Sequence, residues 1–157
     1  MAGDLRAKER AAVTLTSTGA SLTTSSAGSA ATDMDVRAAG NAADDLLARF
    51  ELTCQWATIT GIVAGTIVAE LYLVPKLDGT NAPDIDTTAG ASRLPAGSFV
   101  ATFDATKAPT ASTNARFVTG LVELFPALYT AYIRNTSGQT ISANWTLKVV
   151  SAQAQYT

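Results

Sequence analysis

Apolar and polar residues alternate along most of this chain from Phe50 onward, and this period of two is the feature that most restricts its fold. Successive side chains of a β-strand point to opposite faces, so each such run predicts a strand with one apolar face. The runs span residues 50–56, 67–74, 99–104, 128–133 and 141–149, with shorter strands expected at 13–16, 32–37 and 116–123. No helix-length pattern separates them, which argues against a parallel α/β fold. The sequence therefore predicts an all-β protein, an antiparallel β-sandwich or jelly roll with an extended N-terminal arm.

The apolar faces of these runs predict a single core. Its expected members are Phe50, Leu52, Trp56, Leu71, Leu73, Phe103, Ile133, Trp145 and Leu147. Cys54 shares the apolar face of its run, so we expect a small buried hydrophobic residue rather than a nucleophile. Because it is the only cysteine, an internal disulfide is excluded.

Turn residues separate the runs. Asn135-Thr136-Ser137-Gly138 predicts a tight hairpin between the last two strands. Pro75 favours a sheet edge or a strand end. The long irregular segment from Asp78 to Ala96 is expected to leave the sandwich as a binding loop or an intersubunit arm.

The first part of the chain differs from the rest, and we place a boundary at residue 31. Residues 4–12 are charged and could form two helical turns, and a Ser/Thr/Gly/Ala tract follows them. Too few large apolar groups are present in this tract to offset the entropy of ordering it. We therefore divide the chain into an N-terminal arm (1–31), flexible or ordered by partner contacts, and a β-sandwich domain (32–157). A cleavable targeting segment is a third interpretation of residues 1–31. If they are a partner-ordered arm, a chain that begins near Thr32 is expected to fold but to bind its assembly weakly.

Composition indicates a protein that packs against neighbours. Charged residues make up 15% of the chain, against roughly 25% in an average soluble domain. The small residues Ala, Thr, Ser and Gly take the place of charged ones, so the surface is poorly solvated and favours a homo-oligomer. The alternative is a secreted or thermally robust monomer with a Thr/Ser-rich β surface. The net charge of −2 gives no electrostatic case for nucleic acid. No apolar run is long enough for a membrane span, and residues 1–12 lack the apolar core of a signal peptide.

Catalytic chemistry has little support in this sequence. The chain has no histidine, which removes the usual general base, the Ser-His-Asp and Cys-His arrangements and most zinc or iron sites. Neither a P-loop nor a Rossmann glycine motif is present, and no SxxK spacing supports a Ser-Lys dyad. We therefore expect no enzyme activity, no catalytic residue and no cofactor.

The sequence contains candidate residues for two kinds of binding site, a calcium site and a sugar-stacking platform. The carboxylates that could bind calcium are Asp33, Asp35, Asp44, Asp45, Asp78, Asp84 and Asp86. They lack the order of an EF-hand loop, so we expect solvated carboxylates and no metal, with a calcium clip at a subunit contact as the alternative.

The aromatic residues that could stack on a sugar are Trp56, Trp145, Tyr72, Tyr129 and Tyr132. Both tryptophans fall on apolar faces, which favours the core.

Two segments resemble small virion structural proteins of tailed bacteriophages. They are FPALYTAYIRNTSGQTISANWTLKVVSAQAQYT (Phe125 to Thr157) and TIVAELYLVPKLDG (Thr66 to Gly79), read together with the charged, Ala/Thr-rich amino-terminal arm. Proteins of this class have a β-sandwich or jelly-roll body and an arm that lies along a partner. The likeness carries over no functional residue.

The resemblance implies a role in particle architecture. It implies a capsid decoration or cement protein that binds and reinforces the phage shell, often as a trimer. The implied partners are the major capsid protein or other virion proteins, and the implied location is the virion, assembled in the host cytoplasm. The alternatives are another phage component (tail, adaptor or head fibre) and a glycan-binding β-sandwich module.

Overall fold

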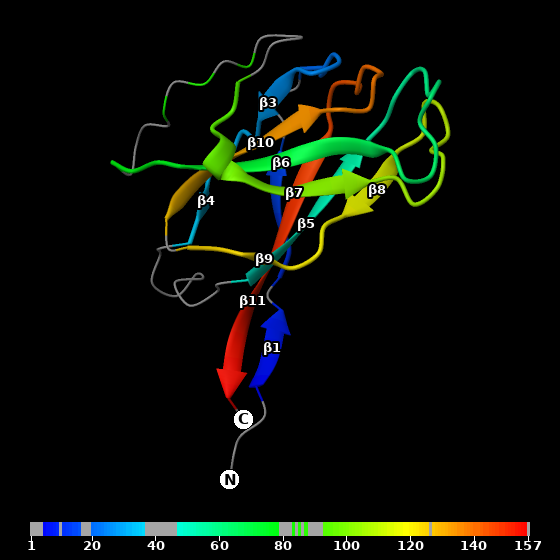
Figure 1. Ribbon diagram of the computed structural model, residues 1–157. Coiled ribbons are helices and arrows are strands. Elements are labelled where there is room, and N and C mark those ends of the chain that lie inside the picture. Colours follow the sequence, from blue (N-terminus) through cyan, green and yellow to red (C-terminus); the bar gives the residue numbers. More distant parts are fainter. Residues whose placement is uncertain are drawn as a thin grey trace.

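The computed structural model describes residues 5–9, 11–16, 20–36, 47–78, 83, 85, 87, 93–125 and 127–156, which form two packed antiparallel β-sheets (Figure 1). The six-stranded sheet contains β1 (Leu5–Glu9), β2 (Val13–Thr16), β5 (Leu47–Cys54), β8 (Ala115–Val118), β9 (Val122–Glu123) and β11 (Thr146–Tyr156). The five-stranded sheet contains β3 (Ala27–Ser29), β4 (Met34–Asp35), β6 (Ile67–Pro75), β7 (Phe99–Asp104) and β10 (Leu128–Asn135). The one helical element in the described part is a 3₁₀ turn, Ala96–Ser98. The predicted all-β sandwich is confirmed.

No helix in the described part of the chain has the length and hydrophobicity that crossing a membrane would require.

The predicted core is confirmed. All nine residues expected there belong to one buried cluster between the two sheets, and Trp56, Phe50 and Phe103 have no exposed surface. Alternation identified these residues because only one face of β5 and of β11 is covered by the opposite sheet. Burying each large side chain stabilises the fold by about 1.5–3 kcal/mol relative to leaving it exposed.

Strand β6 departs from simple alternation. Val68 and its neighbour Ala69 both belong to the core cluster, although alternation placed them on opposite faces. Tyr72 and Val74 are buried but lie outside that cluster. The pairing of β6 with β7 shifts register twice, between Ile67 and Ala69 and between Leu71 and Tyr72. Such irregularities re-aim side chains. Phe99, predicted to share a face with Phe103, pairs with Tyr72 and is 47% exposed.

The predicted hairpin at Asn135–Gly138 is wrong. Strand β10 pairs with β3, β4 and β6, whereas β11 pairs with β1, β2 and β5, so this segment carries the chain from one sheet to the other. Asn135 is fully buried, and its Nδ2 donates to the carbonyl oxygens of Leu22 (2.8 Å) and Gln139 (2.7 Å). Its Oδ1 accepts bonds from the Ser137 backbone N–H and hydroxyl. These bonds satisfy the polar groups that a crossing between sheets would leave unpaired.

The last strand begins later and runs further than the predicted span of 141–149. Asn144 lies in the left-handed region (φ 66°), which interrupts a strand before Thr146. Ile141 instead forms isolated bridges with Leu22 and Trp56. The strand expected at 116–123 is likewise divided into β8 and β9.

The described part of residues 1–31 contains three strands. Strand β2 was predicted at 13–16, whereas β1 lies where helical turns were expected at 4–12 and β3 lies in the Ser/Thr/Gly/Ala tract. Strands β1 and β2 pair with successive parts of β11, and β3 pairs with β10. Leu15 and Leu22 are buried in the core at 1% and 3% exposure. Strands of the same chain thus pair with the described part of this segment, which we had expected to be either flexible or ordered by partner subunits. Whether a partner also contacts it stays a prediction.

Gly28 explains why this segment can pack so closely. A Cβ at this position would lie 2.7 Å from Leu22 Cδ2 and 3.2 Å from Trp145 Cζ2. Only glycine fits without a shift of these two core residues, because interiors are packed to near-crystalline density. The small residues of the tract therefore allow β3 to contact the core directly, a role that composition alone did not reveal.

Candidate functional site

The aromatic residues considered for sugar stacking are mostly inaccessible. Trp56 and Trp145 are buried in the core, as the sequence predicted. Tyr72 and Tyr129 are also buried, and the Tyr129 hydroxyl donates to the Phe125 carbonyl oxygen (2.8 Å). Tyr132 is half-buried and lies next to Tyr72 across β10 and β6. The described rings therefore do not form the exposed platform that the tryptophans and tyrosines would have offered together.

The candidate calcium ligands are not gathered in the described part of the chain. Asp33 is engaged by protein groups, because its two carboxylate oxygens accept bonds from Lys76 Nζ (2.6 Å) and Thr130 Oγ1 (2.8 Å). Asp35 lies in β4, opposite Leu128. The residues that the structure describes contain no group of three or more acidic, cysteine or histidine side chains suited to a metal. Asp44, Asp45, Asp84 and Asp86 lie outside the described residues, as does much of the predicted loop between Asp78 and Ala96.

Cys54 is a core residue. It is 2% exposed, and burial raises the pKa of its thiol from 9.0 to about 12. The thiolate is the nucleophilic form of cysteine, so this side chain is unreactive at neutral pH.

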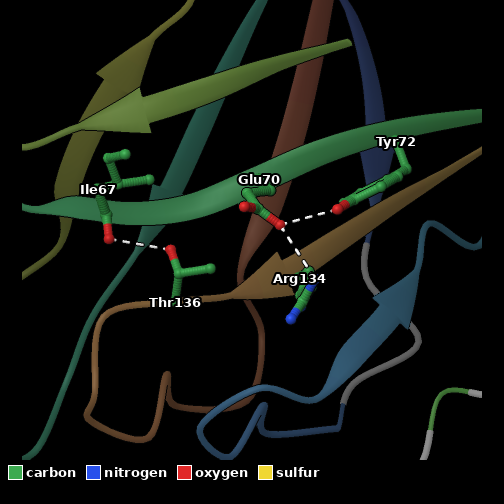
Figure 2. A network of polar contacts seen from close by, with 5 residues as sticks. All are labelled: Ile67, Glu70, Tyr72, Arg134 and Thr136. Carbon is green, nitrogen blue, oxygen red and sulfur yellow. Dashed lines mark hydrogen bonds and ion pairs between the residues drawn. The ribbon is translucent and has the colours of Figure 1, made fainter. Parts of the chain in front are cut away.

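A polar network links β6 and β10 on the outer face of the five-stranded sheet. Figure 2 shows Glu70 between Tyr72 and Arg134. Glu70 Oε2 accepts a hydrogen bond from the Tyr72 hydroxyl (2.8 Å) and an ion-pair contact from Arg134 Nη1 (3.5 Å). Close by, the Thr136 hydroxyl donates to the Ile67 carbonyl oxygen (2.9 Å). Burial, and then the bond to Glu70, raise the pKa of Tyr72, so its phenol stays protonated at neutral pH. The contacts join two strands, which is a structural role.

The surface best suited to a partner lies where the two sheets end side by side. Strand β7 is an edge of one sheet, and β8 with β9 forms an edge of the other. Two adjoining hollows of about 500 and 350 Å³ lie along these edges and share Val100, Leu121 and Val122. We name this surface the edge groove. It is lined by residues 97–102, 104, 106 and 118–125, together with Leu73 and Tyr129.

The edge groove is apolar and exposed. Eight large hydrophobic residues in the described part of the chain are exposed, and four of them line this groove: Phe99 (47%), Val118 (59%), Leu121 (52%) and Phe125 (73%). Single exposed apolar residues are normal, but a contiguous group marks an interaction surface. The only charged residues among those lining the groove are Asp104 and Glu123, and both are acidic.

Both sides of the groove also offer unpaired backbone. Strand β7 pairs only with β6, and β8 pairs only with β5, so each presents one open edge within the described residues. Open strand edges are templates for the addition of another strand. The groove thus combines two means of holding an extended segment, apolar contact and backbone hydrogen bonds.

A second feature projects from the sandwich. Strand β11 pairs with β5 as far as Ala152, and its last described residues, 153–156, pair only with β1. Figure 1 shows the resulting two-stranded ribbon of β1 and β11 extending away from the two sheets. We name the paired segments 5–9 and 152–156 the terminal ribbon. Two strands alone are marginally stable in water, so a partner surface would stabilise this ribbon.

Sequence reasoning did not find the edge groove. Phe99 was placed on the same strand face as the core residue Phe103, and residues 116–123 were assigned to one continuous strand. The available signal was the apolar sequence Val118 to Phe125, in which Val118, Leu121 and Phe125 exceed what a single inward face can bury.

Comparison with known proteins adds no assignment: no protein-family model and no curated protein matches this chain.

Proposed function

We propose that this chain is a structural virion protein, a capsid decoration or cement protein that binds and reinforces a phage shell through oligomeric contacts. The class of particle rests on the sequence resemblance of Thr66–Gly79 and Phe125–Thr157 to virion proteins. The observation that carries the assembly role is the edge groove, where four exposed apolar side chains adjoin two open strand edges.

An assembly protein needs rigid strands and surface that loses water when neighbours pack against it. The edge groove offers such surface, because transferring apolar area from water stabilises a contact by roughly 25 cal/mol per Å². The low charge of the chain, 15%, reduces the cost of desolvating the surrounding surface. These features support self-association and binding to shell proteins.

The proposal includes no catalytic step and no cofactor. Cys54 is buried with a raised thiol pKa, and Glu70 and Tyr72 are bonded to each other in a cross-strand network. The same interface features suit a tail, adaptor or head-fibre protein, which is the alternative position within a particle.

The test is the composition of particles purified by density gradient from cells that produce this chain. Quantitative mass spectrometry should find the chain in the particles at a copy number comparable with that of the major shell protein. Particles that lack the chain should release their nucleic acid at a lower temperature, because a cement protein reinforces the shell. A copy number far below that of the shell protein would favour the tail or fibre alternative, and absence from the particles would refute the virion role.

A further inference from the structure

Two glycines that line the edge groove stand where the described fold does not require glycine. Gly97 lies in the 3₁₀ turn before β7, and Gly120 lies between β8 and β9. A Cβ at either position would meet no described atom within 4 Å beyond its chain neighbours, and neither residue has a positive φ. The other described glycines have a positive φ or, at Gly28, close packing. Glycine also lets a second backbone approach closely, so these two positions leave room for a partner's main chain.

The groove reaches the hydrophobic core between the two sheets. Four of its lining residues belong to the buried core cluster: Leu73, Val122, Leu124 and Tyr129. The strands on its two sides, β7 and β8, each have an open edge within the described residues. An extended segment paired with one of these edges would turn every second side chain towards the core residues, because side chains alternate along a strand. Apolar side chains at those positions would fill the groove.

The carboxylates of the groove mark its two parts. Asp104 borders only the larger hollow and Glu123 only the smaller one, and both side chains are exposed. None of the lining residues is basic. A lysine or arginine near each end of a bound segment would therefore meet a carboxylate of opposite charge, whereas acidic residues there would be repelled.

We propose that the edge groove binds an extended segment of a shell protein, in which apolar residues alternate with polar ones and a basic residue stands near each end. The segment adds as a strand to the open edge of β7 or β8, and its main chain passes close to Gly97 and Gly120. This inference rests on the proposed virion function and names the chemistry of the partner that the groove holds. A second copy of this chain is the competing occupant.

Two synthetic peptides of about eight residues serve as probes, a length that covers the six residues of β7. Both alternate valine with threonine, and one carries lysine near both ends where the other carries glutamate. Fluorescence anisotropy should show that the lysine peptide binds the full chain about tenfold more tightly, because two favourable charge pairs replace two repulsive ones. Asp104→Asn/Glu123→Gln should abolish this preference. Asp78→Asn, at an exposed residue outside the groove, is the matched control and should retain it.

Substitution of the two glycines separates a role in binding from a role in folding. Gly120→Val should weaken binding of the lysine peptide about tenfold, because the new side chain occupies the space of the partner's main chain. Gly97→Ala should weaken it at the other hollow. Neither variant should have a lower melting temperature than the wild-type chain, since the added Cβ meets open space in the free protein.

Three results would overturn the inference. The first is absence of binding by the lysine peptide or equal binding of the two peptides, and the second is undiminished binding by both glycine variants. The third is a sedimentation mass above the 16.2 kDa of one chain that returns to this value in Gly120→Val, because the groove would then hold a second copy. None of these results would remove the chain from purified particles, so a failure of this inference is distinguishable from a failure of the virion role.

Discussion

A chain that starts at Thr32 should lose cooperative folding, because residues 1–31 supply part of the core. The deletion removes Leu15 and Leu22, which are 1% and 3% exposed. Losing one buried leucine costs about 2–5 kcal/mol, and a whole domain is stable by only about 5–15 kcal/mol. Strands β2 and β3 are lost as well, which uncovers edges of β11 and β10. Thermal unfolding followed by circular dichroism should show no sharp transition.

A shorter deletion provides the matched control. A chain that starts at Ala11 keeps β2 and β3 and lacks only β1 among the described strands. It should melt close to the full chain, because β1 pairs with the projecting end of β11 rather than with the core. A sharp, wild-type-like transition in the chain that starts at Thr32 would contradict this account of residues 1–31 and would favour the separate arm that composition suggested.

Replacing Trp145 with alanine should lower the free energy of unfolding by about 3–5 kcal/mol, the range for deleting a large buried aromatic side chain. Trp145 is 2% exposed and packs against the backbone of Gly28. In urea denaturation, the variant should have a lower midpoint than the wild-type chain and an unchanged m-value. A near-neutral result would place Trp145 at the surface and revive the sugar-stacking interpretation.

The two tryptophans differ in their hydrogen bonds, which provides an internal control. Trp56 Nε1 donates to the buried Ser137 hydroxyl (3.1 Å), whereas Trp145 Nε1 has no partner among the described residues. Phenylalanine at 56 should therefore cost about 1 kcal/mol more than phenylalanine at 145, the net value of a typical hydrogen bond. Equal costs would show that the Trp56 bond contributes nothing measurable.

The sequence predicted the strands better than their partners. A period of two identifies a strand whose face is covered, so the core residues of β5, β7 and β11 were found directly. It does not say which sheet a strand joins. Asn135–Gly138 has the composition of a hairpin turn, but the buried bonds of the Asn135 side chain to Leu22 and Gln139 stabilise a crossing between sheets. The bond to Leu22 joins residues far apart in the chain, which no local rule predicts.

Small residues were also misleading in the first 31 positions. The tract has few large apolar groups, and we expected an arm that was either flexible or ordered by a partner. Gly28 instead allows β3 to approach Leu22 and Trp145, because a larger residue at this position would clash with both side chains. The apolar sequence Val118 to Phe125 signalled one side of the edge groove, but the groove as a whole could not be predicted. Its two sides, within 97–106 and 118–125, come from different sheets and meet only in the folded chain.

Hydrogen–deuterium exchange on the free and the particle-bound chain tests the central claim, that the edge groove and the terminal ribbon are the surfaces through which this protein assembles. Within residues 99–104 and 118–125, the amides that face the open edges should exchange quickly in the free chain and slowly on the particle, as should those on the open edge of the ribbon at 5–9. Central strands such as β5 and β6 should be protected in both states, because they are already paired on both sides. Equal exchange of the groove and ribbon amides in the two states would contradict the account.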